Sequence, residues 1–184
     1  MENSYKTVYK DGKDEISIKK SRFIGYGAPI SNEDEALKFI EKIKSIHRDA
    51  THNVYAYVLG KDSNIQRFSD DGEPGGTAGI PALEVLKKED LRNVVVVVTR
   101  YFGGTKLGVG GLIRAYTKGA KIGINASMII EKVLHTKLKL RIDYTLYGIL
   151  ENYLLNKEII IENIVYDDAV KITVFIRKDE EDSF

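Results

Sequence analysis

The sequence predicts a two-domain α+β protein, with a larger unit over residues 1–133 and a small unit over residues 134–184. Three observations support this fold class. Strand-like and helix-like hydrophobic patterns alternate along the larger unit, five consecutive valines begin at Val94, and a separate strand–helix–strand–strand pattern begins near Leu134. The length of 184 residues accommodates either one large domain or two small ones.

Turn residues and alternation locate the first strands. The pair Asp11-Gly12 predicts a turn between one strand at Val8–Lys10 and another at Glu15–Lys19. The segment Arg22–Pro29 predicts a further strand.

An amphipathic helix is expected next, ending at about His47. Ser31 is expected to cap its N-terminus, with Asp34 three residues later as a partner similar to that of a capping box. The apolar residues that recur at helical spacing are Ala36, Leu37, Phe39, Ile40, Ile43 and Ile46.

Two strands, a loop and a second helix follow. Val54–Leu59 and Ile65–Ser69 predict neighbouring strands. Asp70–Gly76 predicts a loop, because it holds three glycines and a proline in seven residues. Pro81 fits only in the first turn of the helix after this loop, where its missing N–H leaves no hydrogen bond unmade. The expected apolar face of that helix comprises Ile80, Leu83 and Leu86.

The valine run predicts the central strand of the larger unit. Val94–Thr99 is almost entirely β-branched, which suits a strand that is buried on both faces. A glycine-rich loop follows, and Leu112–Ile129 then predicts a helix. Small residues recur in this helix every four positions and would let it approach a neighbouring backbone closely. These residues are Ala115, Gly119 and Gly123.

The second unit starts with a strand at Lys137–Tyr144, in which basic and apolar side chains alternate. Thr145 is expected to cap a following helix, and Ile159–Tyr166 and Val170–Arg177 predict two more strands. A ferredoxin-like βαββαβ sheet would need another helix and strand, so the unit is either a shortened form of that sheet or a simpler three-stranded one. The expected inward residues are Leu138, Leu140 and Ile142 on the first strand, and Leu146, Leu150 and Leu154 on the helix. The expected outward residues are Lys137, Lys139 and Arg141.

Composition excludes several classes of function. The chain has no cysteine, which excludes disulfide frameworks and thiolate metal sites. The formal net charge is +1, so nucleic-acid binding would have to come from a local patch. The N-terminus has no apolar signal segment, and the longest purely apolar run is Val94–Val98. We therefore expect a cytoplasmic protein without a membrane partner.

The glycine-rich segment Tyr101–Gly111 is the first candidate site. It lies within Leu91–Ile130, which carries six basic residues and no carboxylate. Its glycines would let backbone amides approach a ligand, and the following helix would add its free N–H groups and positive dipole end. Such a segment could hold a phosphate or a nucleic-acid backbone. The candidate residues are Arg100, Tyr101, Phe102, Gly103, Gly104, Lys106, Gly108, Gly110, Gly111, Arg114 and Lys118.

This segment has two other interpretations. Its spacing fits neither a Walker loop nor the dinucleotide fingerprint, so it carries no signature of a known nucleotide site. The structural alternative is that the glycines serve turns and tight packing while the cations are simply solvated.

The loop DDGEPG is the second candidate motif. Its carboxylates, together with His47 and His52, are of the types that could hold Mg²⁺. Their spacing matches no established ligand pattern, and Asp side chains often bond the backbone of their own turn. We therefore favour a structural turn and expect no metal and no cofactor. The motif comprises Asp70, Asp71, Gly72, Glu73, Pro74 and Gly75.

Both motifs lie in stretches that resemble the Impact/YigZ family of conserved proteins. These stretches are SDDGEPGGTAGIPALEVL and NVVVVVTRYFGGTKLGVGGLIRAY, and SRFIGYG and ATHNVYAYVLG match as well. The resemblance covers residues 4–130 closely and the C-terminal unit more loosely. It implies a first domain similar to the second domain of ribosomal protein S5 and a second domain similar to a ferredoxin-like domain of elongation factor G. Eukaryotic members resemble regulators of translation, and no catalytic role transfers to any residue.

Three hypotheses for function remain. The leading one is a binding protein that docks RNA or the ribosome and regulates translation or the stress response. The alternative is an enzyme acting on a phosphorylated small molecule or nucleotide, with Asp70, Asp71 or Glu73 as general base or Mg²⁺ ligand. The enzyme hypothesis requires that both motifs lie in one cleft. It would lose support if the carboxylates point at backbone amides. The third is an adaptor for a protein partner, with Tyr101 and Phe102 in an exposed patch. The sequence does not indicate an oligomeric state.

Overall fold

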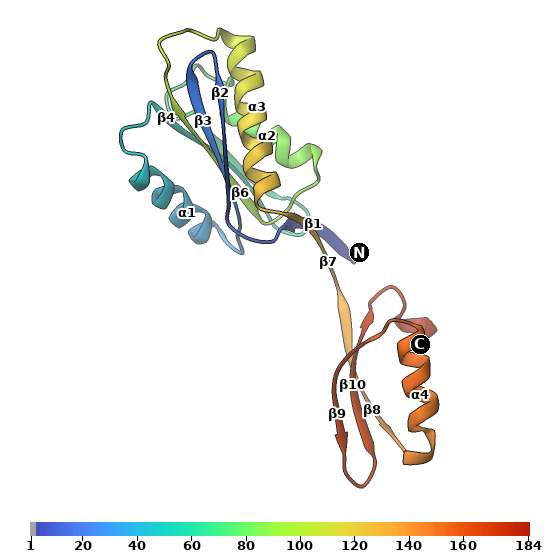
Figure 1. The fold of residues 1–184 in the computed structure, drawn as a ribbon. Helices are drawn as coiled ribbons and strands as arrows, with labels where there is room; N and C mark the ends of the chain where they lie inside the picture. Colours follow the sequence, from blue (N-terminus) through green and yellow to red (C-terminus); the bar gives the residue numbers. More distant parts are fainter. Residues whose placement is uncertain (1–2) are drawn as a thin grey trace. The chain divides into compact units, whose positions relative to one another are not determined.

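The computed structural model describes residues 3–184, apart from the side chain of Asp182. The fold mixes α-helices and β-sheets (Figure 1). The chain divides into two compact units, one of residues Tyr5–Lys132 and the other of Val133–Phe184 together with Asn3 and Ser4. Within the described residues, no helix is both long enough and apolar enough to cross a membrane.

The larger unit is built on a five-stranded antiparallel sheet in the order β2-β3-β6-β4-β5. β6 lies at the centre, and Val94 to Val98 are all 0% exposed, which confirms the valine run as the central strand. The strands are β2 (Gly12–Ile18), β3 (Ser21–Pro29), β4 (His52–Leu59), β5 (Ile65–Ser69) and β6 (Val94–Tyr101).

Helices cover both faces of this sheet (Figure 1). α1 (Glu33–Ile46) packs on one face, and α2 (Gly79–Lys88) and α3 (Val109–Ala126) pack on the other. The valines of β6 point alternately into the two cores. Val95 and Val97 face α1, whereas Val94, Val96 and Val98 face α2 and α3.

The small-residue stripe of α3 makes the close approach that the sequence predicts. A Cβ built on Gly25 of β3 would lie 2.0 Å from the Gly119 carbonyl oxygen, and one on Gly123 would lie 2.7 Å from the Gly25 carbonyl carbon. Any larger side chain at these positions would therefore push the helix away from the sheet.

The N-terminal hairpin differs from the prediction. β1 (Ser4–Val8) pairs with β7 (Ile129–Val133) in a separate two-stranded sheet, so Asp11-Gly12 is not a hairpin turn. The tight turn lies between β2 and β3, at Lys19 and Lys20. Both lysines have positive φ, 46° and 66°, as a two-residue turn that follows the twist of the strands requires.

Four helix ends also differ from the prediction. Asn32 caps α1 in place of Ser31: its side-chain oxygen accepts from the Glu35 amide, and the Glu35 carboxylate accepts from the Ser31 amide at 2.7 Å. Asp143 caps α4 (Tyr144–Asn156) in place of Thr145. α3 begins at Val109 rather than Leu112 and ends at Ala126, because glycine at its start does not prevent helical hydrogen bonding.

The smaller unit contains one three-stranded antiparallel sheet in the order β8-β10-β9. Its strands are β8 (His135–Ile142), β9 (Ile160–Tyr166) and β10 (Val170–Arg177), and η1 (Glu181–Ser183) follows. The alternation predicted for β8 is confirmed, because its apolar side chains pack into the core while Lys137, Lys139 and Arg141 are exposed. Leu154 of α4 is fully buried, but Leu146 is 52% exposed, so the predicted apolar face of this helix is only partly correct. The same holds for α2, where Leu83 and Leu86 are buried and Ile80 is 43% exposed.

Candidate functional site

The DDGEPG loop is held by its own carboxylates. The Asp70 Oδ1 atom accepts from the amides of Ala78 and Gly79 at 3.0 and 2.8 Å, and its Oδ2 atom accepts from the Gly76 amide at 2.9 Å. Asp70 therefore satisfies amides at the start of α2, which has no cap of its own. Asp71 has a φ of 46°, and its carboxylate accepts from the Asn53 amide of β4 at 2.6 Å. These bonds support the interpretation of the two aspartates as structural, although Asp71 bonds the neighbouring strand rather than its own turn.

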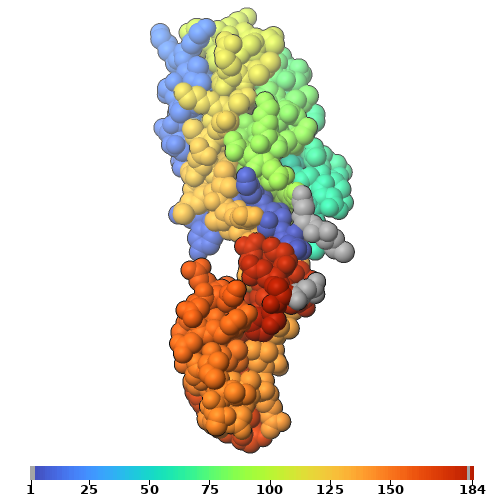
Figure 2. Space-filling model, turned by 90° about the vertical axis from the view of Figure 1, so that its right-hand side faces the viewer, coloured from blue at the N-terminus to red at the C-terminus, as the bar shows by residue number. Residues whose placement is uncertain are grey.

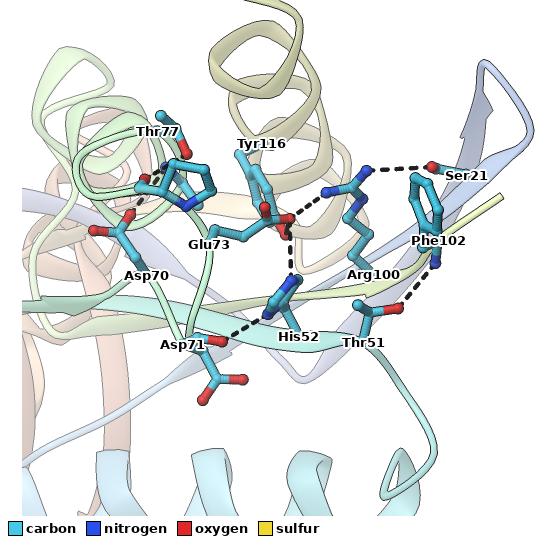
Figure 3. A network of polar contacts seen from close by, with 12 residues as sticks. Ser21, Thr51, His52, Asp70, Asp71, Glu73, Thr77, Arg100, Phe102 and Tyr116 are labelled. Carbon is cyan, nitrogen blue, oxygen red and sulfur yellow. Dashed lines mark hydrogen bonds and ion pairs between the residues drawn. The ribbon is translucent and has the colours of Figure 1, made fainter. Parts of the chain in front are cut away.

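Glu73 and Arg100 join the two sequence motifs in a buried ion pair (Figure 3). The Arg100 Nη1 atom donates to the Glu73 Oε1 atom at 2.5 Å, and only 6% and 4% of the two side chains are exposed. The Tyr116 hydroxyl of α3 donates to the same oxygen at 2.7 Å, and the His52 Nε2 atom approaches it at 3.8 Å. Burial and the hydrogen bond to Glu73 raise the pKa of the Tyr116 phenol, so this group stays protonated and donates.

Two aromatic rings enclose the guanidinium of Arg100. Its central carbon lies 5.5 Å from the ring centroids of both Phe23 and Phe102. Phe102 is 47% exposed, so one part of its ring packs on Arg100 and another part meets solvent. The Arg100 Nε atom has no hydrogen-bond partner among the described residues. Arg100 is therefore not at the surface, contrary to its expected position as a ligand-contacting cation.

The glycine-rich loop packs against the turn between β2 and β3. A Cβ built on Gly103 would lie 1.9 Å from the carbonyl oxygen of Lys20, so only glycine allows this contact. The Gly103 amide also donates to the Ser21 hydroxyl at 3.2 Å, and the Arg100 Nη2 atom donates to the same hydroxyl at 3.5 Å. The contact places Lys19 and Lys20 beside the glycine-rich loop.

Five exposed cations lie on the three segments that meet or adjoin here: the turn between β2 and β3, the glycine-rich loop, and the first turns of α3. None of them forms an ion pair with a residue that the structure describes. By contrast, the nearby Arg22 pairs with Glu15, and Lys121 lies 3.8 Å from Glu89. We call the five the basic surface: Lys19, Lys20, Lys106, Arg114 and Lys118.

Exposed backbone at the start of α3 adjoins the basic surface. Gly108, the N-cap residue, has a φ of 73° and offers no capping side chain. Gly104 has a φ of 81°, and a Cβ on either glycine would meet nothing within 4 Å. Gly110 and Gly111 lie in the first turn of α3, and the Arg114 guanidinium folds back toward Gly110, since a Cβ built there would lie 3.7 Å from Nη1. Cations and the first amides of the helix, which have no partner within α3, thus share one end of α3.

The structure places most predicted site residues at this junction but revises several roles. Tyr101 is not in an exposed patch with Phe102, because its hydroxyl donates to Asp49 at 3.1 Å and contacts His47 at 2.8 Å. His47 is held between tyrosines rather than beside His52, and no group of three or more metal-ligand side chains exists among the described residues. Lys19 and Lys20 were not among the predicted site residues, because their only signal in the sequence is a lysine pair between two strands.

Similar chains occur among bacterial proteins. The Bacillus subtilis protein described as IMPACT family member YvyE is 47% identical over 184 residues, which is all of this chain and 85% of that protein. The Escherichia coli protein described as IMPACT family member YigZ is 40% identical over 129 residues, which is 69% of this chain and 63% of that protein.

Two solved structures are also similar. One described as the crystal structure of a hypothetical protein is 32% identical, with a TM-score of 0.69 over 100% of this chain and 90% of that one. The structure of a two-domain translational regulator, Yih1, is 26% identical, with a TM-score of 0.41 over 66% of this chain and 46% of that one.

Family models cover both units of the chain. The Impact N-terminal domain matches residues 19–124, and a domain of unknown function, DUF1949, matches residues 140–184. The first match alone covers more than half of the chain and includes the DDGEPG motif and the glycine-rich loop. The chain therefore belongs to the Impact family.

Proposed function

We propose that this protein docks on structured RNA or on the ribosome through the basic surface, and that it acts in the regulation of translation in the cytoplasm. The observation that carries the proposal is a set of five exposed cations on adjoining segments, none of which has an ion pair among the described residues. Such cations keep their charge available for phosphates, whereas paired ones are already neutralised. The amides at the start of α3 add a further anion-binding element.

Phe102 supplies a stacking surface next to these cations. Phe102 is 47% exposed, and the Arg100 guanidinium packs against its ring. An aromatic ring beside a positive groove is typical of proteins that bind single-stranded or looped RNA, since bases stack on it without sequence preference. In this proposal Arg100 positions Phe102 and the loop but does not touch the ligand.

The family supports the setting in translation. The motif stretches of this chain resemble those of eukaryotic Impact proteins that regulate translation, and Yih1 is described as a translational regulator. We also propose that the larger unit is similar to the second domain of ribosomal protein S5. The order β8-β10-β9 fits three strands of a ferredoxin-like sheet, which supports the proposed similarity to elongation factor G.

One observation favours the alternative of an enzyme, and another argues against it. The two motifs meet, as an active site would require, through the contact between Glu73 and Arg100. However, Asp70 and Asp71 accept from backbone amides, and Glu73 is buried against a cation and a phenol. Each carboxylate of the motif is therefore already engaged by a hydrogen bond or an ion pair, so binding remains the function that the geometry favours.

Co-sedimentation with purified ribosomes across a salt series tests the proposal. The test variant is Lys19→Gln/Lys20→Gln/Lys106→Gln, since glutamine tolerates the turn about as well as lysine and removes only the charge. The control variant, Lys38→Gln/Lys42→Gln/Lys61→Gln, makes the same change in net charge at other exposed lysines. We expect the test variant alone to lose binding at low salt. Equal binding by both variants, or no binding by the native protein, would overturn the proposal.

A further inference from the structure

A trough runs between α2 and α3 on the outer side of the larger unit. Its volume is about 360 Å³. Figure 2 looks onto this face, where the green surface of α2 adjoins the yellow to orange surface of α3. The residues that matter for its chemistry are Ile80, Pro81, Val85, Lys88, Ile113 and Lys121.

Two regular ridges border the trough. On α2, Ile80, Glu84 and Lys88 recur every four residues, and on α3, Ile113, Thr117 and Lys121 do the same. Side chains four apart lie on one face of a helix, so each ridge extends over about 12 Å, or two helical turns.

Each ridge is apolar at one end and positively charged at the other. The isoleucines stand at one end, 43% and 39% exposed at positions 80 and 113, and Val109 extends the apolar end at 62% exposure. The lysines stand at the other end of each ridge. The trough therefore presents apolar side chains next to cations, on the scale of two turns of a third helix.

Positive charge predominates on the helices around the trough. α3 carries three cations and no carboxylate over its whole length. The one carboxylate of α2, Glu84, pairs with Lys87 at 2.7 Å, and Lys88 has no ion pair with any described residue. The contact of Lys121 with Glu89 is 3.8 Å long and exposed, so solvent screens it strongly. This surface is thus complementary to an acidic partner.

We propose that the trough between α2 and α3 binds an acidic amphipathic helix of a partner protein. Apolar residues of that helix, spaced three or four apart, would cover Ile80 and Ile113, and its carboxylates would meet Lys88 and Lys121. A helix fits because both walls are helices whose ridges can interlock with a third. RNA fits less well, because the apolar end contains no aromatic ring for stacking. The proposal does not depend on the proposed docking to RNA.

A defined peptide serves as the probe. It is a 16-residue helix whose contact face, at positions three or four apart, carries leucine over one half of its length and glutamate over the other half. Two controls are a scrambled peptide of the same composition and a peptide with lysine in place of glutamate. Titration into the full-length, ¹⁵N-labelled protein is expected to shift amide signals of α2 and α3 with the acidic helix only. Absence of shifts, shifts elsewhere in the protein, or equal binding of either control would overturn the proposal.

Two variants of the protein make the test specific. Ile113→Asp changes a partly exposed side chain. It should weaken the affinity for the acidic peptide at least about tenfold, because it removes an apolar contact and adds a charge that repels the glutamates of the peptide. Lys88→Glu/Lys121→Glu should reverse the preference, so that the lysine peptide binds and the glutamate peptide does not. Thermal unfolding checks that both variants fold. The proposal would be contradicted if either variant binds the acidic peptide with an affinity within twofold of the native protein. Unchanged ribosome binding by Ile113→Asp would show that the two sites are separate.

Discussion

The buried pair of Glu73 and Arg100 offers a quantitative test of how the two motifs are held together. Glu73→Gln keeps the shape of the side chain and an acceptor for the Tyr116 hydroxyl, but it leaves Arg100 charged with only 6% of its side chain exposed. Removing one partner of a buried ion pair costs about 3–5 kcal/mol, because the remaining charge is uncompensated. Glutamine keeps some hydrogen bonding, so we expect about 3 kcal/mol. That loss corresponds to a fall of roughly 10 °C in the midpoint of thermal unfolding.

Thermal and urea unfolding, followed by circular dichroism, measure this loss. Glu15→Gln is the matched control, since Glu15 pairs with Arg22 at 2.6 Å while 48% of each side chain is exposed, and such exposed pairs contribute little. Adding Arg100→Met to Glu73→Gln should recover part of the lost stability, because the uncompensated charge is then gone. A loss for Glu73→Gln no greater than that for Glu15→Gln would refute the reasoning.

Three further predictions concern the core, the loop and a titrating histidine. Gly25→Ala would place a methyl group 2.0 Å from the Gly119 carbonyl oxygen, so urea unfolding should reveal a loss of about 3 kcal/mol. Gly75→Ala, whose methyl group meets nothing within 4 Å, should change stability by less than about 0.5 kcal/mol, and similar losses for the two would contradict this packing. Asp70→Ala removes the acceptor of three backbone amides and should cost about 2 kcal/mol by urea unfolding, with partial recovery in Asp70→Asn. Burial lowers the pKa of His47 below its ordinary value of 6.5, so the unfolded chain takes up the proton first and stability should fall as the pH drops below about 6.5. An NMR titration of the imidazole checks the direction, and a pKa above 6.5 would contradict it.

Much of the larger unit could be predicted because its patterns are long and local. The valine run of β6 and the small-residue stripe of α3 each follow from residues within one element. The β1 pairing could not be predicted in this way. Its partner β7 lies at the far end of the unit, and the true turn at Lys19 and Lys20 lacks the glycine or asparagine that usually marks such a turn.

The position of Arg100 illustrates the limit of motif reasoning at the site. A cation beside a glycine-rich loop suggests an exposed ligand contact, but its burial depends on Glu73, which is 27 residues away in the chain. One local signal does exist. Side chains alternate along a strand, so continuing β6 beyond Val98 places Arg100 on the same face as the buried valines that meet α2 and α3.

The salt dependence of binding to a structured RNA tests the central claim most directly. Fluorescence anisotropy would give the association constant of the native protein and of Lys19→Gln/Lys20→Gln/Lys106→Gln at several salt concentrations. If the basic surface contacts phosphates, the logarithm of the constant falls linearly with that of the salt concentration, and the variant loses up to about three units of slope. A native constant that does not change with salt, or a variant with the native slope and affinity, would contradict the account.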